Sequence, residues 1–134
     1  MQKQTREDYL RTIYCLDEEG DGNVRSVDIG KDLKVSKPAV SAMLKKLKTE
    51  GYIKMAPYSK ISLTLKGFKK AKKLTYKHRV AEVFLREILE LEEGKIHEEA
   101  HRLEHSLSDK ATDKLFELLK NPKICPCGHP ILKP

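Results

Sequence analysis

Tryptophan is absent from this chain of 134 residues, and only 6% of its residues are aromatic. We therefore do not expect a large aromatic-lined pocket for an organic substrate. No apolar run approaches the roughly 20 residues that span a membrane. The first residues lead into a charged segment rather than into the apolar core of a secretion signal. The sequence thus predicts no membrane partner and no export.

Cysteine is scarce: the chain has three, an odd number that excludes a fully paired disulfide framework. This usage fits a reducing compartment, so we expect a cytoplasmic protein. Two of the cysteines stand close to a histidine near the end of the chain, as Cys125, Cys127 and His129. These ligands fall short of the four of a structural zinc site, so an inert tail is favoured over a small zinc or redox element.

Acidic residues are nearly missing from the middle of the chain. Lysine and arginine total 27 against 20 aspartates and glutamates, a net charge of +7. Residues 34–60 hold seven lysines and one acid, and residues 66–79 hold seven basic residues and no acid. A basic block of this kind favours a polyanionic partner, although a solvated lysine face would give the same pattern.

Apolar periodicity predicts a mainly α-helical chain with a small β-hairpin. Helices are expected over residues 5–19, 27–33, 37–50, 66–90, 93–106 and 109–120. Ser26 and Ser36 are the predicted N-caps of the second and third helices. Residues 52–55 and 61–65 are expected to form two strands around a basic turn. The proline-containing tail, residues 121–134, is expected to be irregular and to lie on the surface.

The order helix, helix, short turn, basic helix, basic hairpin is that of a winged helix-turn-helix. A recognition helix fits the major groove of B-DNA and its leading residues reach base edges, while lysines neutralise phosphates. A helix-turn-helix used only for protein contact or packing does not need an outward face of serine and lysine. We therefore predict that double-stranded DNA is bound through Ser36, Lys37, Pro38, Ala39, Ser41, Lys45, Tyr58 and Lys60.

All five histidines lie in the second half of the chain, and four of them stand before the proline-containing tail. These four combine with glutamates on two successive predicted helices: His78 and Glu82 on the first, and His97, His101, Glu104 and His105 on the second. At these spacings the members of each set share one helix face. Imidazole and carboxylate groups bind divalent first-row metals, and one helical turn brings such pairs within reach of one ion. A lone histidine would be structural or solvated, but this cluster predicts a metal site.

These segments resemble the diphtheria toxin repressor family of metal-dependent transcriptional repressors, which has iron-type and manganese-type members. The likeness is carried by residues 8–14 (DYLRTIY), 35–41 (VSKPAVS), 77–82 (KHRVAE), 97–105 (HEEAHRLEH) and 128–131 (GHPI). It implies a winged helix-turn-helix DNA-binding domain over residues 1–73. A helical metal-binding and dimerisation domain would follow over residues 74–134, in a short form without the additional C-terminal domain of the iron type.

The resemblance also implies two metal sites. The primary site would consist of Asp8, His101, Glu104 and His105, and an ancillary site of His78, Glu82 and His97. Iron-type members share Arg11, but they have methionine at the position of Asp8 and cysteine at the position of His101. Manganese-type members share the aspartate, but they have glutamates at the positions of Arg11 and His101. Because the ligands are nitrogen and oxygen, we expect Fe(II) or Mn(II) as the cofactor, with Zn(II), Co(II) or Ni(II) as alternatives.

The implied function is metal-dependent repression without enzyme activity. An ion that bridges Asp8 to the second domain would tie the domains together and favour a homodimer that binds a palindromic operator controlling metal homeostasis. Two other functions compete with this one. Residues 97–101 are an H-E-x-x-H pattern, typical of a zinc metallopeptidase, which would also need a third ligand and a substrate cleft. A winged-helix repressor that senses a non-metal ligand, with structural histidines, is the other alternative.

Overall fold

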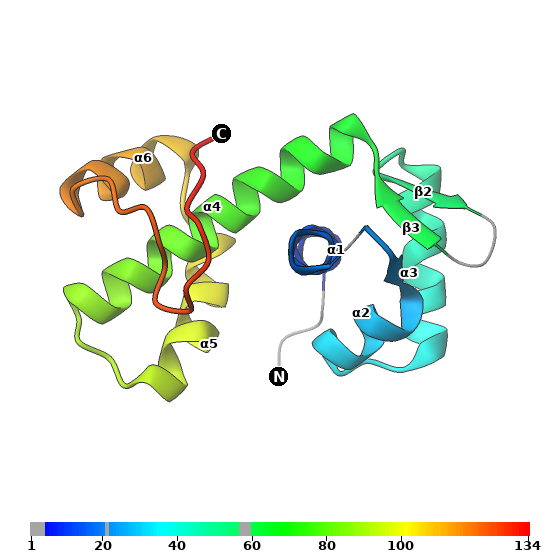
Figure 1. Ribbon diagram of the computed structural model, residues 1–134, viewed down its shortest axis with the longest axis horizontal. Coiled ribbons are helices and arrows are strands. Elements are labelled where there is room, and N and C mark those ends of the chain that lie inside the picture. Colours follow the sequence, from blue (N-terminus) through cyan, green and yellow to red (C-terminus); the bar gives the residue numbers. More distant parts are fainter. Residues whose placement is uncertain (1–4, 21, 57–59) are drawn as a thin grey trace. The chain divides into compact units, whose positions relative to one another are not determined.

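The computed structural model describes residues 5–20, 22–56 and 60–134, and it contains two compact units, Met1–Lys72 and Lys73–Pro134 (Figure 1). Helix α4 (Leu65–Glu87) runs from the first unit into the second. Within the described residues no helix is both long and apolar enough to cross a membrane. The mainly helical architecture with a small antiparallel sheet confirms the predicted fold class.

The first unit combines helices with a small sheet before α4 begins. Its elements are α1 (Arg6–Glu19), β1 (Val24–Arg25), α2 (Ser26–Leu33), α3 (Lys37–Thr49), β2 (Ile53–Ala56) and β3 (Lys60–Leu63). The strand order is β1-β3-β2, and both pairings are antiparallel. The β2–β3 hairpin pairs Met55 with Ile61, in a register that buries Ile53 and Ile61 on the inner face of the sheet.

The sequence does not predict strand β1, because two residues are too few for an alternating pattern. Pairing with β3 keeps Arg25 extended, and Arg25 is the N-cap of α2, with its N–H donating to the Asp28 carboxylate at 3.2 Å. Ser26 is therefore the first helical residue, and the prediction that it caps α2 is wrong. Ser36 does cap α3, since its hydroxyl accepts a hydrogen bond from Ala39 N at 3.3 Å.

Side chains from all of these elements form the core of the first unit. The fully or almost fully buried members are Tyr9, Leu10, Ile13, Tyr14, Val24, Ile29, Val40, Leu44, Leu47, Ile53, Ile61 and Ala71. Burial of each large apolar side chain contributes about 1.5–3 kcal/mol to stability. The apolar stripe of α3 thus fixes this helix against α2 and β2, and its polar side stays exposed.

Gly67 on α4 is in close contact with the backbone of Tyr52. A Cβ at this position would overlap the carbonyl oxygen of Tyr52. We expect Gly67→Ala to lower the free energy of unfolding by about 1–3 kcal/mol, the usual cost of overpacking. Gly94→Ala on a helix of the second unit is the control: no atom lies within 4 Å of that Cβ, and alanine should be neutral or stabilising by up to about 1 kcal/mol. Urea denaturation measures both, and wild-type stability of Gly67→Ala would contradict the close packing.

The second unit consists of the rest of α4, helices α5 (Glu93–Glu104) and α6 (Asp109–Leu118), and the tail. Helix α4 ends at Glu87 rather than at the predicted residue 90, because the chain turns at Glu90, where φ is +52°. Two apolar clusters stabilise the unit. One contains Tyr76, Val80, Val83, Phe116, Cys125 and Ile131, and the other contains Ala81, Leu85, Ile96 and Ala100.

The tail packs into the first of these clusters, so the prediction of a surface segment is wrong for part of it. Cys125 and Ile131 are 3% and 6% exposed. A β-bridge joins Ile124 to Pro130, and the Arg79 guanidinium donates to the carbonyl oxygen of Pro130 at 2.7 Å. These contacts turn two apolar side chains inward. The proline-containing sequence of the tail does not predict their burial.

Candidate metal centres and nucleic-acid interface

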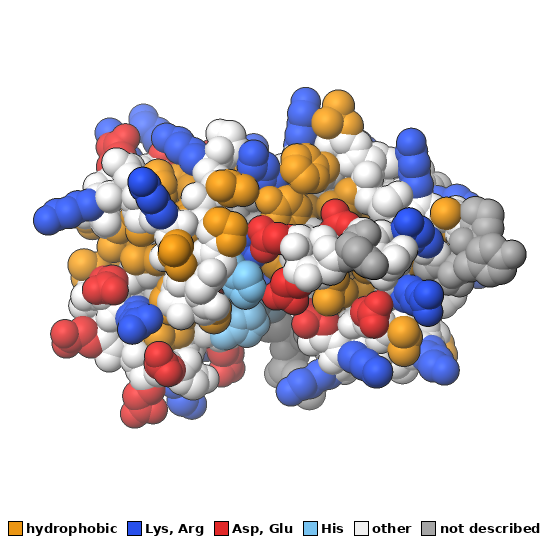
Figure 2. Space-filling model, viewed as in Figure 1, with side chains coloured by type: hydrophobic (Ala, Val, Ile, Leu, Met, Phe, Trp, Pro, Cys, Tyr) orange, Lys and Arg blue, Asp and Glu red, His pale blue; other side chains and the backbone are white. Residues whose placement is uncertain are grey.

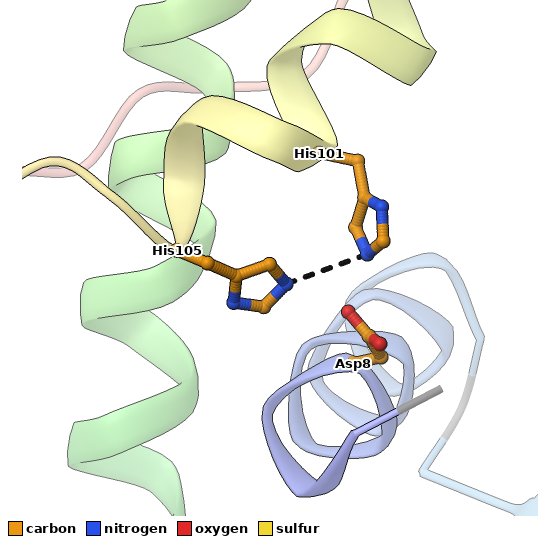
Figure 3. Close-up of side chains that lie close together, drawn as sticks. All are labelled: Asp8, His101 and His105. Atoms are coloured by element: carbon orange, nitrogen blue, oxygen red, sulfur yellow. Dashed lines mark hydrogen bonds between the residues drawn. The ribbon is translucent and has the colours of Figure 1, made fainter. Parts of the chain in front are cut away.

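Two imidazoles on successive turns of α5 face each other. The Nε2 atoms of His101 and His105 are 3.4 Å apart and the ring centroids are 5.0 Å apart (Figure 3). Two nitrogen ligands about 2.1 Å from one ion, at a tetrahedral angle, also lie about 3.4 Å apart. The pair therefore has the spacing of two ligands on one metal ion. His101 is half-buried and His105 is exposed, and histidine side chains gather at the surface in the view of Figure 2.

Asp8, also labelled in Figure 3, belongs to α1 in the first unit and has a local structural role. Its carboxylate accepts a hydrogen bond from Thr5 N at 2.8 Å, and its own N–H donates to the Thr5 hydroxyl at 3.3 Å. This reciprocal pair is a capping box at the start of α1. Such a hydrogen bond also fixes the orientation of a carboxylate ligand. The participation of Asp8 in a site with the α5 histidines stays a prediction.

His78, Glu82 and His97 form a cluster that lies entirely within the second unit. One ligand atom from each lies within 4.8 Å of the other two. His78 and Glu82 are one helical turn apart on α4, with Nε2 of His78 3.7 Å from Oε1 of Glu82. His97 on α5 meets the His78 ring edge-on, with ring centroids 4.8 Å apart. The structure thus brings together the three residues of the predicted ancillary site.

Glu104 contacts the ancillary cluster. Its Oε1 lies 2.7 Å from Nδ1 of His78, and both side chains are buried. An ionised carboxylate can only accept, so Nδ1 of His78 donates to Glu104, and Nε2 is the nitrogen on the side of Glu82. A carboxylate behind the imidazole is the usual way to orient a metal-binding histidine. Helical phase places Glu104 on the face of His101 and His105, and its role in that primary set stays a prediction.

Glu82 belongs to a further group, with Cys125 and Cys127 of the tail. One ligand atom from each lies within 4.8 Å of the others, and the Cys127 thiol donates to Oε2 of Glu82 at 3.5 Å. Burial raises the pKa of the Cys125 thiol, and burial together with the Glu82 carboxylate raises the pKa of Cys127 to about 11. The sequence does not reveal this group, because Glu82 is 45 positions from Cys127.

The outward edge of α3 is polar and exposed. It contains Ser36, Lys37, Pro38, Ala39, Ser41 and Lys45, all of which are exposed. The lysine side chains of this edge can neutralise phosphates, whereas the start of α3 offers few backbone N–H groups, because Pro38 has none and that of Ala39 donates to the Ser36 hydroxyl. Lys60, at the start of β3, is exposed as well, whereas Tyr58 lies outside the described residues.

A groove of about 760 Å³ runs along α3 in the first unit. Its floor is apolar and includes Val35, Val40 and Leu44, while lysines of α2 and α3 line its edges. Lysine and arginine side chains are spread over the face of this unit drawn in Figure 2. The geometry of α3 therefore suits a polyanion that approaches the helix from its exposed side.

Two sequence families match these two parts of the chain. Residues 1–61 match the family described as iron-dependent repressor, N-terminal DNA-binding domain. Residues 64–133 match iron-dependent repressor, metal-binding and dimerisation domain. The chain belongs to the iron-dependent repressor family. The family consists of repressors rather than enzymes, and its metal-binding domain decides against the alternative of a non-metal ligand.

Curated relatives and solved structures agree with this assignment. The uncharacterized HTH-type transcriptional regulator MJ0568 of Methanocaldococcus jannaschii is 41% identical over 112 residues, which are 84% of this chain and 90% of that protein. The iron-dependent repressor IdeR of Mycobacterium leprae is 38% identical over 127 residues, 95% of this chain and 55% of IdeR. The structure of the manganese regulator SloR has a TM-score of 0.84 and 38% identity, and the match covers 98% of this chain and 64% of that chain.

This iron-dependent repressor homologue therefore spans just over half the length of IdeR and less than two thirds of the SloR chain. Diphtheria toxin repressors are also among its relatives, for example that of Corynebacterium diphtheriae at 38% identity. The resemblance to the diphtheria toxin repressor family is thus confirmed.

The H-E-x-x-H pattern does not form a peptidase site in this iron-dependent repressor homologue. Its two histidines turn to different partners, since His97 contacts the His78 ring and His101 contacts His105. Glu98, which would activate water in a peptidase, is exposed and forms an ion pair with an arginine of its own helix at 3.2 Å. The metallopeptidase alternative is wrong.

Proposed function

We propose that this protein is a transcriptional repressor that binds its operator as a homodimer when a divalent metal ion is bound. The observation that carries the proposal is the pair of histidine clusters at ligand spacing in the part of the chain that matches a metal-binding and dimerisation domain. The exposed, lysine-rich edge of α3 supports DNA as the partner. We also propose that the domains extend over residues 1–73 and 74–134, and that the protein acts in the cytoplasm.

The proposed primary ligands are Asp8, His101, Glu104 and His105. The donor chemistry fits: imidazole and carboxylate groups suit a divalent first-row ion, and the α5 pair has the spacing of two such ligands. When bound, the ion supplies a positive charge that holds carboxylate and imidazole ligands together. Asp8 lies in the first turn of α1, so fixing its carboxylate also fixes this helix, which packs against α2.

The proposed ancillary ligands are His78, Glu82 and His97, with Glu104 orienting His78. In this set Nε2 of His78 is the proposed metal-binding nitrogen, because the opposite nitrogen donates to Glu104. These side chains all belong to the second unit, and two of the three are buried.

We propose Fe(II) or Mn(II) as the regulating ion. The ligands of both histidine sets are nitrogen and oxygen, which suit either ion. IdeR is named an iron-dependent repressor, and SloR a manganese regulator. Zn(II), Co(II) and Ni(II) remain alternatives because their intrinsic affinity for such ligands is higher than that of Mn(II).

A test of DNA recognition uses the lysines of α3. We expect Lys37→Ala and Lys45→Ala each to weaken operator binding and to reduce the slope of log affinity against log salt by about 0.9, because each removes one phosphate contact. Fluorescence anisotropy over a salt series measures both quantities. Lys110→Ala, an exposed lysine on α6, is the matched control and should change neither. An unchanged slope in both α3 variants would contradict the proposed interface.

The operator itself is found by selection from fragmented genomic DNA. The full chain, loaded with Mn(II), or with Fe(II) under anaerobic conditions, should enrich fragments that share one palindrome with half-sites about 34 Å apart. Failure to enrich any sequence with either ion, or with Zn(II), Co(II) or Ni(II), would contradict the proposed function.

A further inference from the structure

The Glu82 carboxylate serves two clusters at once. Its Oε1 faces the histidine side, 3.7 Å from Nε2 of His78, and its Oε2 accepts a hydrogen bond from the Cys127 thiol at 3.5 Å. Glu82 is 3% exposed, so both oxygens lie inside the unit. The two clusters are separate groups of ligand atoms that have Glu82 in common.

The thiol side of Glu82 is held in place by a tight loop. Cys125 N donates to the carbonyl oxygen of His129 at 2.9 Å, and Gly128 N donates back to the Cys125 carbonyl oxygen at 2.9 Å. Gly128 has φ of +87°, a conformation that glycine adopts without strain. The Arg79 guanidinium anchors the loop to α4 through the carbonyl oxygen of Pro130. The two thiols are therefore positioned before any ligand binds, which lowers the entropic cost of binding.

We propose that Glu82 bridges two neighbouring divalent cations: one held on the histidine side by His78 and His97, and one on the thiol side by Cys125 and Cys127. The histidine half rests on the proposed function, whereas the thiol half does not. In carboxylate-bridged pairs the two ions are about 3.5–4 Å apart, which matches a carboxylate whose two oxygens point to different clusters.

The chemistry of the thiol side favours a borderline-soft ion such as Zn(II). A thiolate at about 2.3 Å and a carboxylate oxygen at about 2.1 Å from one tetrahedral ion lie about 3.6 Å apart, close to the 3.5 Å between Cys127 Sγ and Glu82 Oε2. Binding displaces the thiol protons, so the site gains two negative charges as the ion arrives. Arg79 and two divalent ions then balance the thiolates, Glu82 and Glu104 to within about one charge, which satisfies the rule that buried charges are paired.

Co(II) is the probe for this site, because a thiolate bound to Co(II) gives an intense charge-transfer band in the near ultraviolet. Titration of the metal-free full chain with Co(II), and separately with Zn(II), should show this band and one bound ion more than in Cys125→Ser/Cys127→Ser. The double variant should lose the band and that ion. Cys15→Ser is the matched control, since Cys15 packs against the core of the first unit, and it should retain both.

Glu82→Gln tests whether the Glu82 carboxylate binds an ion in each of the two clusters. Removal of one ligand charge at each site should lower Co(II) affinity at least about tenfold on both sides, whereas His97→Ala should weaken the histidine side and keep the thiolate band. Circular dichroism of the metal-free variants establishes that they fold. A wild-type chain without a thiolate band would overturn the thiol site, and a Glu82→Gln variant with an unchanged band and thiol-side affinity would overturn the bridge.

The outcomes for the bridge and for the repressor are distinguishable. Metal-stimulated operator binding should survive in Cys125→Ser/Cys127→Ser, because the primary ligands are untouched. A wild-type chain that shows metal-stimulated operator binding but no thiolate band would therefore contradict the bridge alone. A wild-type chain without metal-stimulated operator binding would contradict the proposed function alone.

Discussion

Asp8→Ala is expected to remove most of the metal stimulation of operator binding and to leave the weak metal-free binding unchanged. The variant loses the only proposed primary ligand in the DNA-binding unit, so an ion on α5 no longer acts on α1. Couplings of this kind amount to about 1–3 kcal/mol, so the stimulation that is lost should lie between about 5-fold and 150-fold. Anisotropy titrations of operator DNA at saturating Mn(II) and in chelator measure the two states.

The control for Asp8 is its capping partner. Asp8 also closes the capping box of α1 with Thr5, so a loss of binding in Asp8→Ala can arise from a weakened helix. Thr5→Ala breaks the same capping box at a cost of about 0.5–2 kcal/mol but keeps the carboxylate. It should retain metal stimulation. Equal losses with and without metal in Asp8→Ala, or a loss of stimulation in Thr5→Ala, would contradict the bridging role.

Glu104→Ala should destabilise the metal-free protein by about 1–3 kcal/mol, because it leaves the buried Nδ1–H of His78 without its acceptor. Glu104→Gln keeps an oxygen that can accept this bond and should be less destabilising. Both variants lose the carboxylate that orients His78 and that is also a proposed primary ligand, so Mn(II) affinity should fall by about 10–100-fold. Urea denaturation without metal and isothermal titration with Mn(II) separate the two effects.

Glu98→Ala is the matched control for this residue. Glu98 is on the same helix, but it is exposed and pairs only with the arginine one turn later. Exposed pairs of this kind contribute about 0–1 kcal/mol, so stability and metal affinity should change little. Wild-type stability of metal-free Glu104→Ala would contradict the His78–Glu104 contact.

The winged helix-turn-helix is predictable from sequence because its signals are local. The apolar stripe of α3, the Ser36 cap and the alternation in β3 each lie within a dozen residues. What the sequence misses depends on partners far along the chain. Strand β1 exists only by pairing with β3, and this pairing moves the start of α2 to Ser26. The ends of α4, α5 and α6 fall two or three residues before the predicted ends. Helix propensity changes little in these stretches, so the position of the following turn sets the end of each helix.

For the metal ligands, too, local spacing is predictable from sequence, whereas contacts between distant segments are not. Spacing of i and i+4 predicts that His78 pairs with Glu82, and that His101 pairs with His105. Helical phase alone assigns Glu104 to the face of His105, whereas the packing of α5 on α4 turns its carboxylate to His78. The sequence does not show that Glu82 reaches the tail cysteines from α4, because the two segments lie far apart along the chain.

The central claim is that a divalent ion controls attachment to DNA. Its most direct test compares operator affinity of the purified full chain after exhaustive chelation with the affinity after Mn(II) or Fe(II) is restored. We predict a loss of about 5–150-fold on chelation and full recovery on addition of the ion. Operator binding of equal strength in both states would contradict metal control and leave a winged-helix protein whose histidines have another role.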